Sequence, residues 1–265
     1  MPQNVLDKVW AHFDRTPPLA PWPIHYRTDE ADRLRRLRVL GVRAFPSLLY
    51  PHKPGMAAWL NGWATGFARQ HPDVLHTGTF YPEPEAAAYV GRALSDGARV
   101  FKAHVQVGAY DPRDPLLDRV WGQLADAAVP VVVHCGDGPS RGPFTGPGPF
   151  SDVLARHPSL TAVVAHMGMP DYGAFLDLAR RYPRAHLDTT MVFTDFVEAR
   201  LPFPRALRPA LADLADRVVL GSDFPNTPYA YAHQLEALRG LDLGDDWLRA
   251  VLHDNGARLV GLQAG

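Results

Sequence analysis

The sequence predicts an α/β fold, a (β/α)8 TIM-like barrel, on three observations. Short apolar runs alternate with helical stretches at a repeat of roughly thirty residues, which is typical of parallel strands joined by helices. The length of 265 residues is normal for one barrel, which takes about 250. Several apolar runs end in a histidine or an aspartate, where barrel enzymes carry their functional groups. Residues 1–265 are therefore predicted to form a single domain.

The first part of the chain is predicted to be mostly helical. An apolar stripe at helical spacing predicts a helix over 4–14, and a basic segment predicts a second helix over 28–39 with Thr28 as its cap. The first recognisable strand covers 42–48, and a helix near 55–70 follows it. This part therefore contributes one strand and three helices.

The rest of the chain alternates regularly between apolar strands and amphipathic helices. The predicted strands cover 74–80, 99–105, 131–134, 161–166, 185–189 and 218–222. The predicted helices cover 83–95, 115–127, 149–157, 170–182, 205–214 and 229–239, with two short ones at 245–252 and 255–262. Such alternation predicts a parallel sheet that is buried on both faces.

The strand count is one short of a closed barrel. Seven strands are found, and an eight-stranded barrel needs one more. Each later helix has a strand before it, but Met1 lies too close to the helix over 4–14 for a strand to fit between them. We therefore expect strand one to be missing from this chain, the domain to be N-terminally incomplete, and the natural chain to begin upstream of Met1.

The composition limits the partners and the compartment. Hydrophobic residues make up 46% of the chain and the net charge is -1, with no basic stripe that would bind nucleic acid. No apolar run reaches the roughly 20 residues of a membrane span, and no signal-peptide layout is present at the N-terminus. With Cys135 as the single cysteine, we expect a cytoplasmic protein that acts on a small molecule. An open sheet edge would favour a homo-oligomer.

Three polar residues end consecutive or nearby apolar strands. His134 follows Val-Pro-Val-Val-Val, His166 follows Thr-Ala-Val-Val-Ala, and Asp223 follows Arg-Val-Val-Leu-Gly-Ser. Imidazole and carboxylate groups are common ligands of zinc and manganese, and a neutral imidazole is also a general base near neutral pH. The alternatives are two satisfied structural histidines and a turn-forming aspartate. The pattern favours a metal-dependent enzyme.

Further polar residues are candidate substrate contacts. Lys102, His104 and Gln106 share one face of their strand, because side chains alternate along a strand. They are interpreted either as substrate-binding groups or as a polar layer inside the barrel. Arg141, in the Gly/Pro-rich loop over 136–150, is expected to meet an anionic substrate if this loop borders the pocket; the alternative is a rigid connector.

Asp188, Thr190 and Cys135 are weaker candidates. Asp188 and Thr190 share a face of the seventh strand and are less favoured as site residues. Cys135 points the opposite way from His134, so we expect it to be packed and inert.

Together these motifs resemble the second amidohydrolase family, which belongs to the metal-dependent amidohydrolase superfamily and includes aminocarboxymuconate-semialdehyde decarboxylase and related nonoxidative decarboxylases. The motifs are Phe-Lys-Ala-His-Val-Gln-Val, Val-Val-Val-His-Cys-Gly, Val-Val-Ala-His-Met-Gly, Gly-Ser-Asp-Phe-Pro and Asn-Gly-Ala-Arg-Leu-Val-Gly-Leu. The resemblance implies a distorted TIM barrel with one divalent metal, commonly zinc. It implies that His134 and Asp223 bind the metal, that Asp223 also accepts a proton, and that His166 assists the activated water.

The sequence departs from the family pattern at one point. The family carries a His-x-His pair at the end of strand one, and both imidazoles bind metal, whereas no His-x-His occurs in this chain. We therefore expect Asp-x-His-x-His immediately before residue 1 in the natural protein. As it stands, the chain is expected to bind metal poorly, with the metal absent in the extreme case, and to be weakly active or inactive.

Three interpretations of function remain at this level. The first is a metal-dependent hydrolase that acts on a C–N or C–O bond next to a carbonyl group. The second is a nonoxidative decarboxylase or related lyase on a small carboxylic acid, with Arg141, Lys102 or another cation holding the carboxylate. The third is a catalytically impaired barrel that lacks the His-x-His ligands and persists as a binding or scaffold protein.

Overall fold

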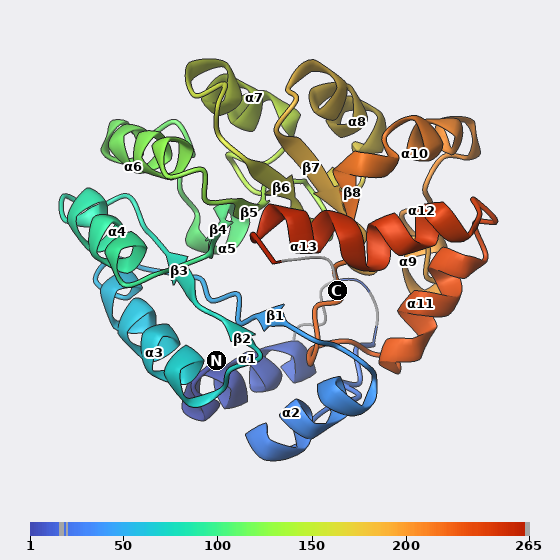
Figure 1. The fold of residues 1–265 in the computed structure, drawn as a ribbon, viewed down its shortest axis with the longest axis horizontal. Helices are drawn as coiled ribbons and strands as arrows, with labels where there is room; N and C mark the ends of the chain where they lie inside the picture. Colours follow the sequence, from blue (N-terminus) through green and yellow to red (C-terminus); the bar gives the residue numbers. More distant parts are fainter. Residues whose placement is uncertain (16–18, 20, 263–265) are drawn as a thin grey trace.

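The computed structural model describes residues 1–15, 19 and 21–262. Parallel strands line the centre of the molecule and helices surround them, as in a TIM barrel (Figure 1). The N-terminal helices α1 (Gln3–Arg15) and α2 (Glu30–Val39) lie together on one side, and the helices of the middle of the chain follow around the ring. This arrangement confirms the predicted α/β fold class.

The strands follow the predicted order along the chain, and all but β5, which has the predicted bounds, are shorter than expected. They are β1 (Phe45–Pro46), β2 (Val74–Leu75), β3 (Thr77–Thr79), β4 (Val100–His104), β5 (Val131–His134), β6 (Ala162–Val164), β7 (Ala185–Asp188) and β8 (Val218–Val219). The predicted strand over 74–80 is divided at His76 into β2 and β3, which pair with different neighbours.

The helices lie between these strands. The longer ones after α2 are α3 (Ala57–Gln70), α4 (Ala86–Ser95), α6 (Pro115–Asp126), α7 (Pro147–Arg156), α8 (Tyr172–Arg181) and α11 (Tyr231–Arg239). The short ones are α5 (Val105–Gly108), α9 (Asp195–Glu198), α10 (Pro209–Asp213), α12 (Asp245–Arg249) and α13 (Asn255–Leu259), with 3-10 turns at Ala165–Gly168, Arg205–Leu207 and Ala215–Arg217 and a π-helical segment at Ala250–Asp254.

The helix boundaries differ from the predictions in two instructive places. Asp29, rather than Thr28, caps α2, and its carboxylate accepts a hydrogen bond from the backbone N–H of Asp32. The expected helix over 205–214 divides into a 3-10 turn and α10, since Pro209 cannot donate a backbone hydrogen bond within a continuous helix. No described helix combines the length and apolar character that crossing a membrane would take.

The sheet is parallel throughout and falls into two parts. Strands β3 to β8 pair in chain order, and β1 pairs separately with β2. No ladder joins β8 to β1 among the described residues, so these two strands form the edges. The backbone N–H of Leu220, just beyond β8, donates instead to the carbonyl of Val251 in the π-helical segment.

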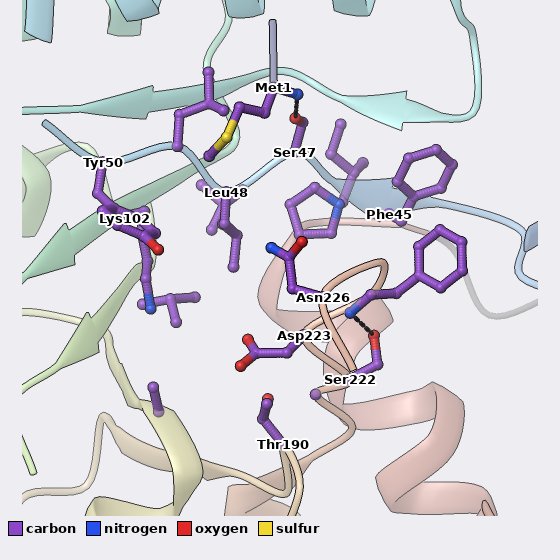
Figure 2. A pocket seen from close by; sticks show the side chains of 18 of the residues that line it. Met1, Phe45, Ser47, Leu48, Tyr50, Lys102, Thr190, Ser222, Asp223 and Asn226 are labelled. Atoms are coloured by element: carbon purple, nitrogen blue, oxygen red, sulfur yellow. Dashed lines mark hydrogen bonds between the residues drawn. The ribbon is translucent and has the colours of Figure 1, made fainter. Parts of the chain in front are cut away.

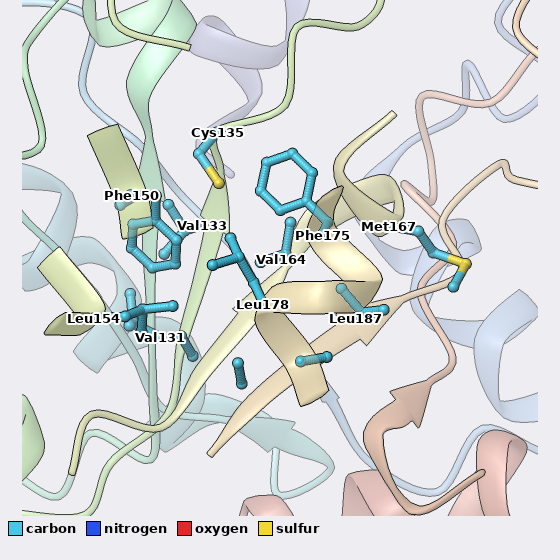
Figure 3. Packing of buried hydrophobic residues seen from close by; sticks show 14 of the residues in the cluster. Val131, Val133, Cys135, Phe150, Leu154, Val164, Met167, Phe175, Leu178 and Leu187 are labelled. Carbon is cyan, nitrogen blue, oxygen red and sulfur yellow. The ribbon is translucent and has the colours of Figure 1, made fainter. Parts of the chain in front are cut away.

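The core has an outer and an inner layer. The outer layer packs the sheet against the helices and contains Val133, Phe150, Phe175 and Leu187 (Figure 3). Cys135 belongs to this layer, is fully buried, and carries a free thiol whose pKa is raised by burial, as the packed, inert role predicts.

The inner layer lies inside the barrel. Apolar side chains from successive strands meet there, with Leu48 and Leu259 packed against them; the buried members are Val100, Val132, Val163, Ala165 and Val219. The same strands end in the polar residues of the candidate site. The apolar interior therefore gives way to a polar mouth within a few residues of each strand.

Candidate active site

The candidate site lies at the C-terminal ends of the strands, beside a large cavity. The cavity has a volume of about 2130 Å³ and extends from Ser47 and Leu48 on the β1 side to Ser222 and Asp223 beyond β8. Figure 2 shows Lys102 and Asp223 directed into this space from opposite sides. The missing ladder between β8 and β1 is what leaves the barrel interior open here.

Three histidines from adjacent strands lie next to one another at this mouth. The rings of His104 and His134 are stacked with centroids 4.0 Å apart, and those of His134 and His166 meet edge to face at 4.9 Å. All three are buried, with exposures of 8%, 5% and 7%. Parallel pairing produces this row, because His104 and His134 are register partners at the ends of β4 and β5.

Backbone carbonyls fix the protonation of two of these rings. Nε2 of His134 lies 3.0 Å from the carbonyl of Gly138, and Nδ1 of His166 lies 3.1 Å from the carbonyl of Thr190. A carbonyl oxygen only accepts, so each of these nitrogens carries the proton. The lone pairs left free are on Nδ1 of His134 and Nε2 of His166, and such second-atom hydrogen bonds are typical of metal-binding and catalytic histidines.

The side chains of His166 and Asp223 lie opposite each other at the mouth of the cavity. Nε2 of His166 is 3.8 Å from Oδ2 of Asp223, and the Asp223 side chain is 48% exposed at the mouth. Nδ1 is committed to the carbonyl of Thr190, so Nε2 is the ring nitrogen that faces the carboxylate. A proton on Nε2, a water molecule or a cation would make this approach favourable.

The backbone around this pair is strained and tightly held. His166 has φ of 54° and Asp223 has φ of 52°, left-handed values that cost a non-glycine residue about 1–3 kcal/mol each. The carboxylate of Asp188 holds the first of them in place, because it accepts from the backbone N–H of His166 at 2.8 Å and of Thr190 at 3.0 Å. Such strain is characteristic of functional sites.

Gly221 allows the β7 and β8 segments to approach at this point. A Cβ at Gly221 would lie 1.9 Å from Oγ1 of Thr190 and 2.9 Å from the carboxyl carbon of Asp188. Only glycine therefore fits against the residues that hold His166.

Lys102 supplies a buried positive charge to the wall of the cavity. It is buried, with 6% exposure, and burial lowers its pKa while the nearby carboxylates Asp188 and Asp223 raise it in part. Burial also lowers the pKa of His104 and of His134 well below the usual value, and the neighbouring imidazoles and Lys102 add to this effect. His104 and His134 are therefore neutral near pH 7, and Lys102 is a buried group near them that is able to attract an anion.

Of the remaining predicted substrate contacts, His104 lies at the cavity and Arg141 lies away from it. His104 lines the cavity, and its Nδ1 accepts from the backbone N–H of Val107. Arg141 does not line the cavity. Its side chain is 81% exposed and pairs with Asp137 at 3.3 Å. The structure thus brings together His134, His166 and Asp223 with Lys102 and His104, and leaves Arg141 outside.

Tyr50 was not singled out from the sequence and belongs to the site. It lines the cavity, its ring lies 4.5 Å from that of His104, and burial and the charge of Asp223 raise the pKa of its hydroxyl to about 12. Its signal in the sequence is its position just beyond the first predicted strand, which is the same signal that identifies His134.

The donor set is incomplete for a metal ion. Nδ1 of His134 and the carboxylate of Asp223 are suitable donors, but structural and catalytic zinc sites use at least three protein ligands. Residues 1–15, 19 and 21–262 contain no group of three or more His, Cys, Asp or Glu side chains that could hold a metal. The described residues therefore do not fit a metal on their own.

The comparison with known proteins assigns the family. The sequence model of a protein family described as Amidohydrolase matches residues 3–262. The chain belongs to this amidohydrolase family. No functionally curated protein matches its sequence.

Solved structures share the fold of this amidohydrolase-family chain. An uncharacterized TIM-barrel protein from Bordetella bronchiseptica superposes with a TM-score of 0.74 at 22% identity, over 97% of this chain and 91% of that one. A 5-carboxyvanillate decarboxylase from Novosphingobium aromaticivorans, solved with manganese and 4-hydroxy-3-methoxy-5-nitrobenzoic acid, gives 0.66 at 14% identity over 96% and 87%.

A hydrolase structure is similar to the chain as well. A probable 2-pyrone-4,6-dicarboxylic acid hydrolase from Acinetobacter baumannii, with citric acid bound, gives a TM-score of 0.61 at 14% identity over 91% and 94%. At these identities the likeness establishes the TIM-barrel fold, and the neighbours include both hydrolases and decarboxylases.

Proposed function

We propose that this amidohydrolase-family protein is an enzyme that hydrolyses a C–N or C–O bond next to a carbonyl group of a small anionic molecule. The observation that carries the proposal is the His166–Asp223 pair, 3.8 Å apart, at the mouth of a cavity that also holds the buried Lys102. The pair supplies a proton acceptor and the lysine supplies an anchor for negative charge.

Each residue of the site has its own role in the proposed reaction. Asp223, half-exposed at the mouth, accepts a proton from the attacking water, and Nε2 of His166 holds that water beside it. Lys102 binds the anionic end of the substrate within the cavity. The hydroxyl of Tyr50, with its raised pKa, stays protonated and donates a hydrogen bond to the carbonyl oxygen.

The expected metal, zinc or alternatively manganese, would use His134 and Asp223 together with ligands that the described residues lack. The place from which those ligands would reach the mouth is the gap between β1 and β8, where the sheet is open and the cavity runs. We propose that a further extended segment closes the barrel there. On the described residues alone, metal binding is expected to be weak and substoichiometric.

Nonoxidative decarboxylation of a small carboxylic acid is the second candidate. The observation that favours it is Lys102, a cation buried beside Asp188 and Asp223 that would hold a carboxylate at the reacting centre. The free, buried thiol of Cys135 supports a reducing compartment, and we propose the cytoplasm for either reaction.

A substrate panel with two readouts tests the proposal. The purified chain, with added Zn²⁺, Mn²⁺ or neither, is offered amides, esters, lactones and aromatic carboxylic acids, while acid release and carbon dioxide are measured. We expect acid release from one class, and a fall of about 100-fold or more in Asp223→Asn. Asp213→Asn, an exposed residue of α10, is the matched control.

Two results would count against this function. Turnover that Asp223→Asn leaves unchanged would show that the proton acceptor lies elsewhere, and carbon dioxide without hydrolysis products would select the second candidate. Metal content per chain is measured on the same samples. One metal ion retained per chain after dialysis would contradict the incomplete donor set.

A further inference from the structure

A second pocket lies at the opposite end of the barrel from the candidate active site. It has a volume of about 380 Å³, and the residues that line it include Thr161, Arg184 and Arg217, which directly precede β6, β7 and β8. His186 near the start of β7 and Arg258 of α13 complete its polar wall. We call it the basal pocket, because the N-terminal ends of the strands form it.

The basal pocket is strongly basic. Three guanidinium groups line it, from Arg184, Arg217 and Arg258, against the single carboxylate of Asp216. That carboxylate accepts from Nε of Arg217 at 3.1 Å, and Nη2 of Arg258 donates to the Asp216 carbonyl at 2.9 Å. Two positive charges in excess therefore remain around a small concave space.

Two buried polar atoms of the pocket have no partner in the described part of the chain. They are Nδ1 of His186 and Nη1 of Arg217. His186 is only 7% exposed, so its unpaired nitrogen lies in the interior of the fold. Buried polar atoms are nearly always hydrogen-bonded in native proteins, and an unpaired one needs an explanation. A ligand that accepts from the guanidinium and bonds the imidazole would satisfy both.

The protonation state of His186 depends on the charged groups around the basal pocket. Burial lowers the pKa of His186, and the positive charges of Arg217 and Arg258 lower it as well. Asp216 raises it in part, and the resulting pKa is about 4. The imidazole is therefore neutral near pH 7 in a positive field. An anion placed between these groups would oppose that field and favour the charged imidazole.

We propose that the basal pocket binds a phosphate group, contacted by Arg217, Arg258 and His186. Guanidinium groups match the oxygen geometry of phosphate and form charge-assisted hydrogen bonds with it. The pocket is open to both inorganic phosphate and a small phosphate monoester, and the two share this chemistry. The three contacting residues, Arg217, Arg258 and His186, do not line the large cavity, and the site does not depend on the proposed reaction.

Calorimetric titration of the whole chain with inorganic phosphate tests the proposal, in chloride buffer at constant ionic strength. We expect one site per chain, and binding weaker by about tenfold or more in Arg217→Gln. Arg184→Gln, at the exposed rim of the pocket, is the second variant in case Arg217→Gln fails to fold, and we expect it to weaken binding several-fold. Arg119→Gln, an exposed residue of α6, should bind like the unmodified chain.

Histidine NMR locates the bound phosphate. Phosphate should raise the pKa of His186 by at least about one pH unit, since an opposite charge within a few ångströms has this effect. The charged groups that line the pocket with this imidazole are Arg184, Arg217, Arg258 and Asp216. A change in the pKa of His186 therefore reports an ion bound in the basal pocket and not one bound to Lys102 at the mouth.

A comparison of two phosphate compounds identifies the source of the phosphate, and three results would overturn the proposal. Tighter binding of glycerol 3-phosphate than of inorganic phosphate would identify an organic phosphate, and the reverse order would identify the free ion. A dissociation constant above about 10 mM for both, or equal binding by the unmodified chain and the two pocket variants, would overturn the proposal. So would binding that leaves the pKa of His186 unchanged.

Discussion

The single residue with the clearest chemical assignment is His166. Its Nδ1 is committed to the carbonyl of Thr190, its backbone N–H to the carboxylate of Asp188, and its φ of 54° is left-handed. These constraints leave Nε2 as the one free functional atom, and Asp223 lies opposite it. The residue is therefore held in one orientation, as its proposed role requires.

Lys102 leads to the first prediction. Lys102→Met removes the positive charge of this residue from the cavity and keeps most of the side chain's length. For an anionic substrate we expect KM to rise by about tenfold or more, because a buried charge-assisted hydrogen bond is lost, while kcat changes less. Steady-state kinetics with an uncharged analogue of the same substrate provide the internal control. An equal loss for the charged and the uncharged compound would show that Lys102 supports the fold and not the anion.

At the level of single residues, the positions of the strand-end groups could be predicted from the sequence, while their roles stay predictions. His134, His166 and Asp223 each follow an apolar run, and parallel strands bring such ends together. Arg141 was harder to place, since a Gly/Pro-rich loop has no periodicity that fixes the direction of a side chain. Asp188 was undervalued, because its two hydrogen bonds to backbone N–H groups come from a turn that no pattern reveals.

The β7 and β8 segments form the element that supports the site, and the second prediction concerns their contact. Gly221→Ala places a methyl group 1.9 Å from Oγ1 of Thr190, so a neighbour must move. We expect a loss of about 1–3 kcal/mol in the free energy of unfolding, together with lower activity, as overpacking typically costs this much. Urea unfolding followed by circular dichroism measures the loss.

Gly148→Ala in α7 is the matched control for that substitution. Its Cβ would meet nothing within 4 Å, and an alanine in a helix is slightly favourable. We expect the unfolding midpoint to stay the same or to rise. If Gly221→Ala were as stable as Gly148→Ala, the close approach of β7 and β8 would be refuted.

Among the elements, the order of strands and helices was predictable and their extent was not. Period and composition identify an apolar run such as 42–48, but pairing decides how much of it is a strand. Only Phe45–Pro46 finds a partner, because β2 leaves β1 after Val74–Leu75 and β3 turns to β4. The positions of the turns that divide these elements depend on tertiary contacts, which a short stretch of sequence does not contain.

On the scale of the whole molecule, buried histidines make stability depend on pH, which is the third prediction. Burial and two arginines lower the pKa of His186 from 6.5 to about 4, so the folded state resists protonation. The stabilising contribution is complete above pH 6.5 and is lost as the pH falls from 6.5 toward about 4. The loss attributable to His186 is about 3 kcal/mol over this window.

Thermal unfolding across this pH range, in buffers free of phosphate, measures the effect. His186→Gln has no imidazole to protonate, so we expect its stability to fall less steeply with decreasing pH than that of the unmodified chain. The comparison uses slopes, so a constant offset in stability does not affect it. Parallel curves for the two proteins would contradict the assignment.

The seven strands recognised in the sequence all occur in the barrel, one of them divided into β2 and β3. In the described residues β1 and β8 share no ladder, and the large cavity is lined from both sides of this gap. The alternation of strands and helices predicted the fold, while the missing first strand and the roles of the strand-end groups stay predictions. The basal pocket could not be predicted, because Arg217, Arg258 and His186 meet only through the packing of α13 beneath the sheet.

The most direct test of the account is a double-mutant cycle on kcat/KM with His166→Gln, Asp223→Asn and the combined variant. If the two residues act on one water molecule, the double variant loses about as much as the more damaging single one, because the groups work as a unit. Losses that multiply independently would show that His166 and Asp223 do not share a task, and the proposed proton-transfer pair would be abandoned.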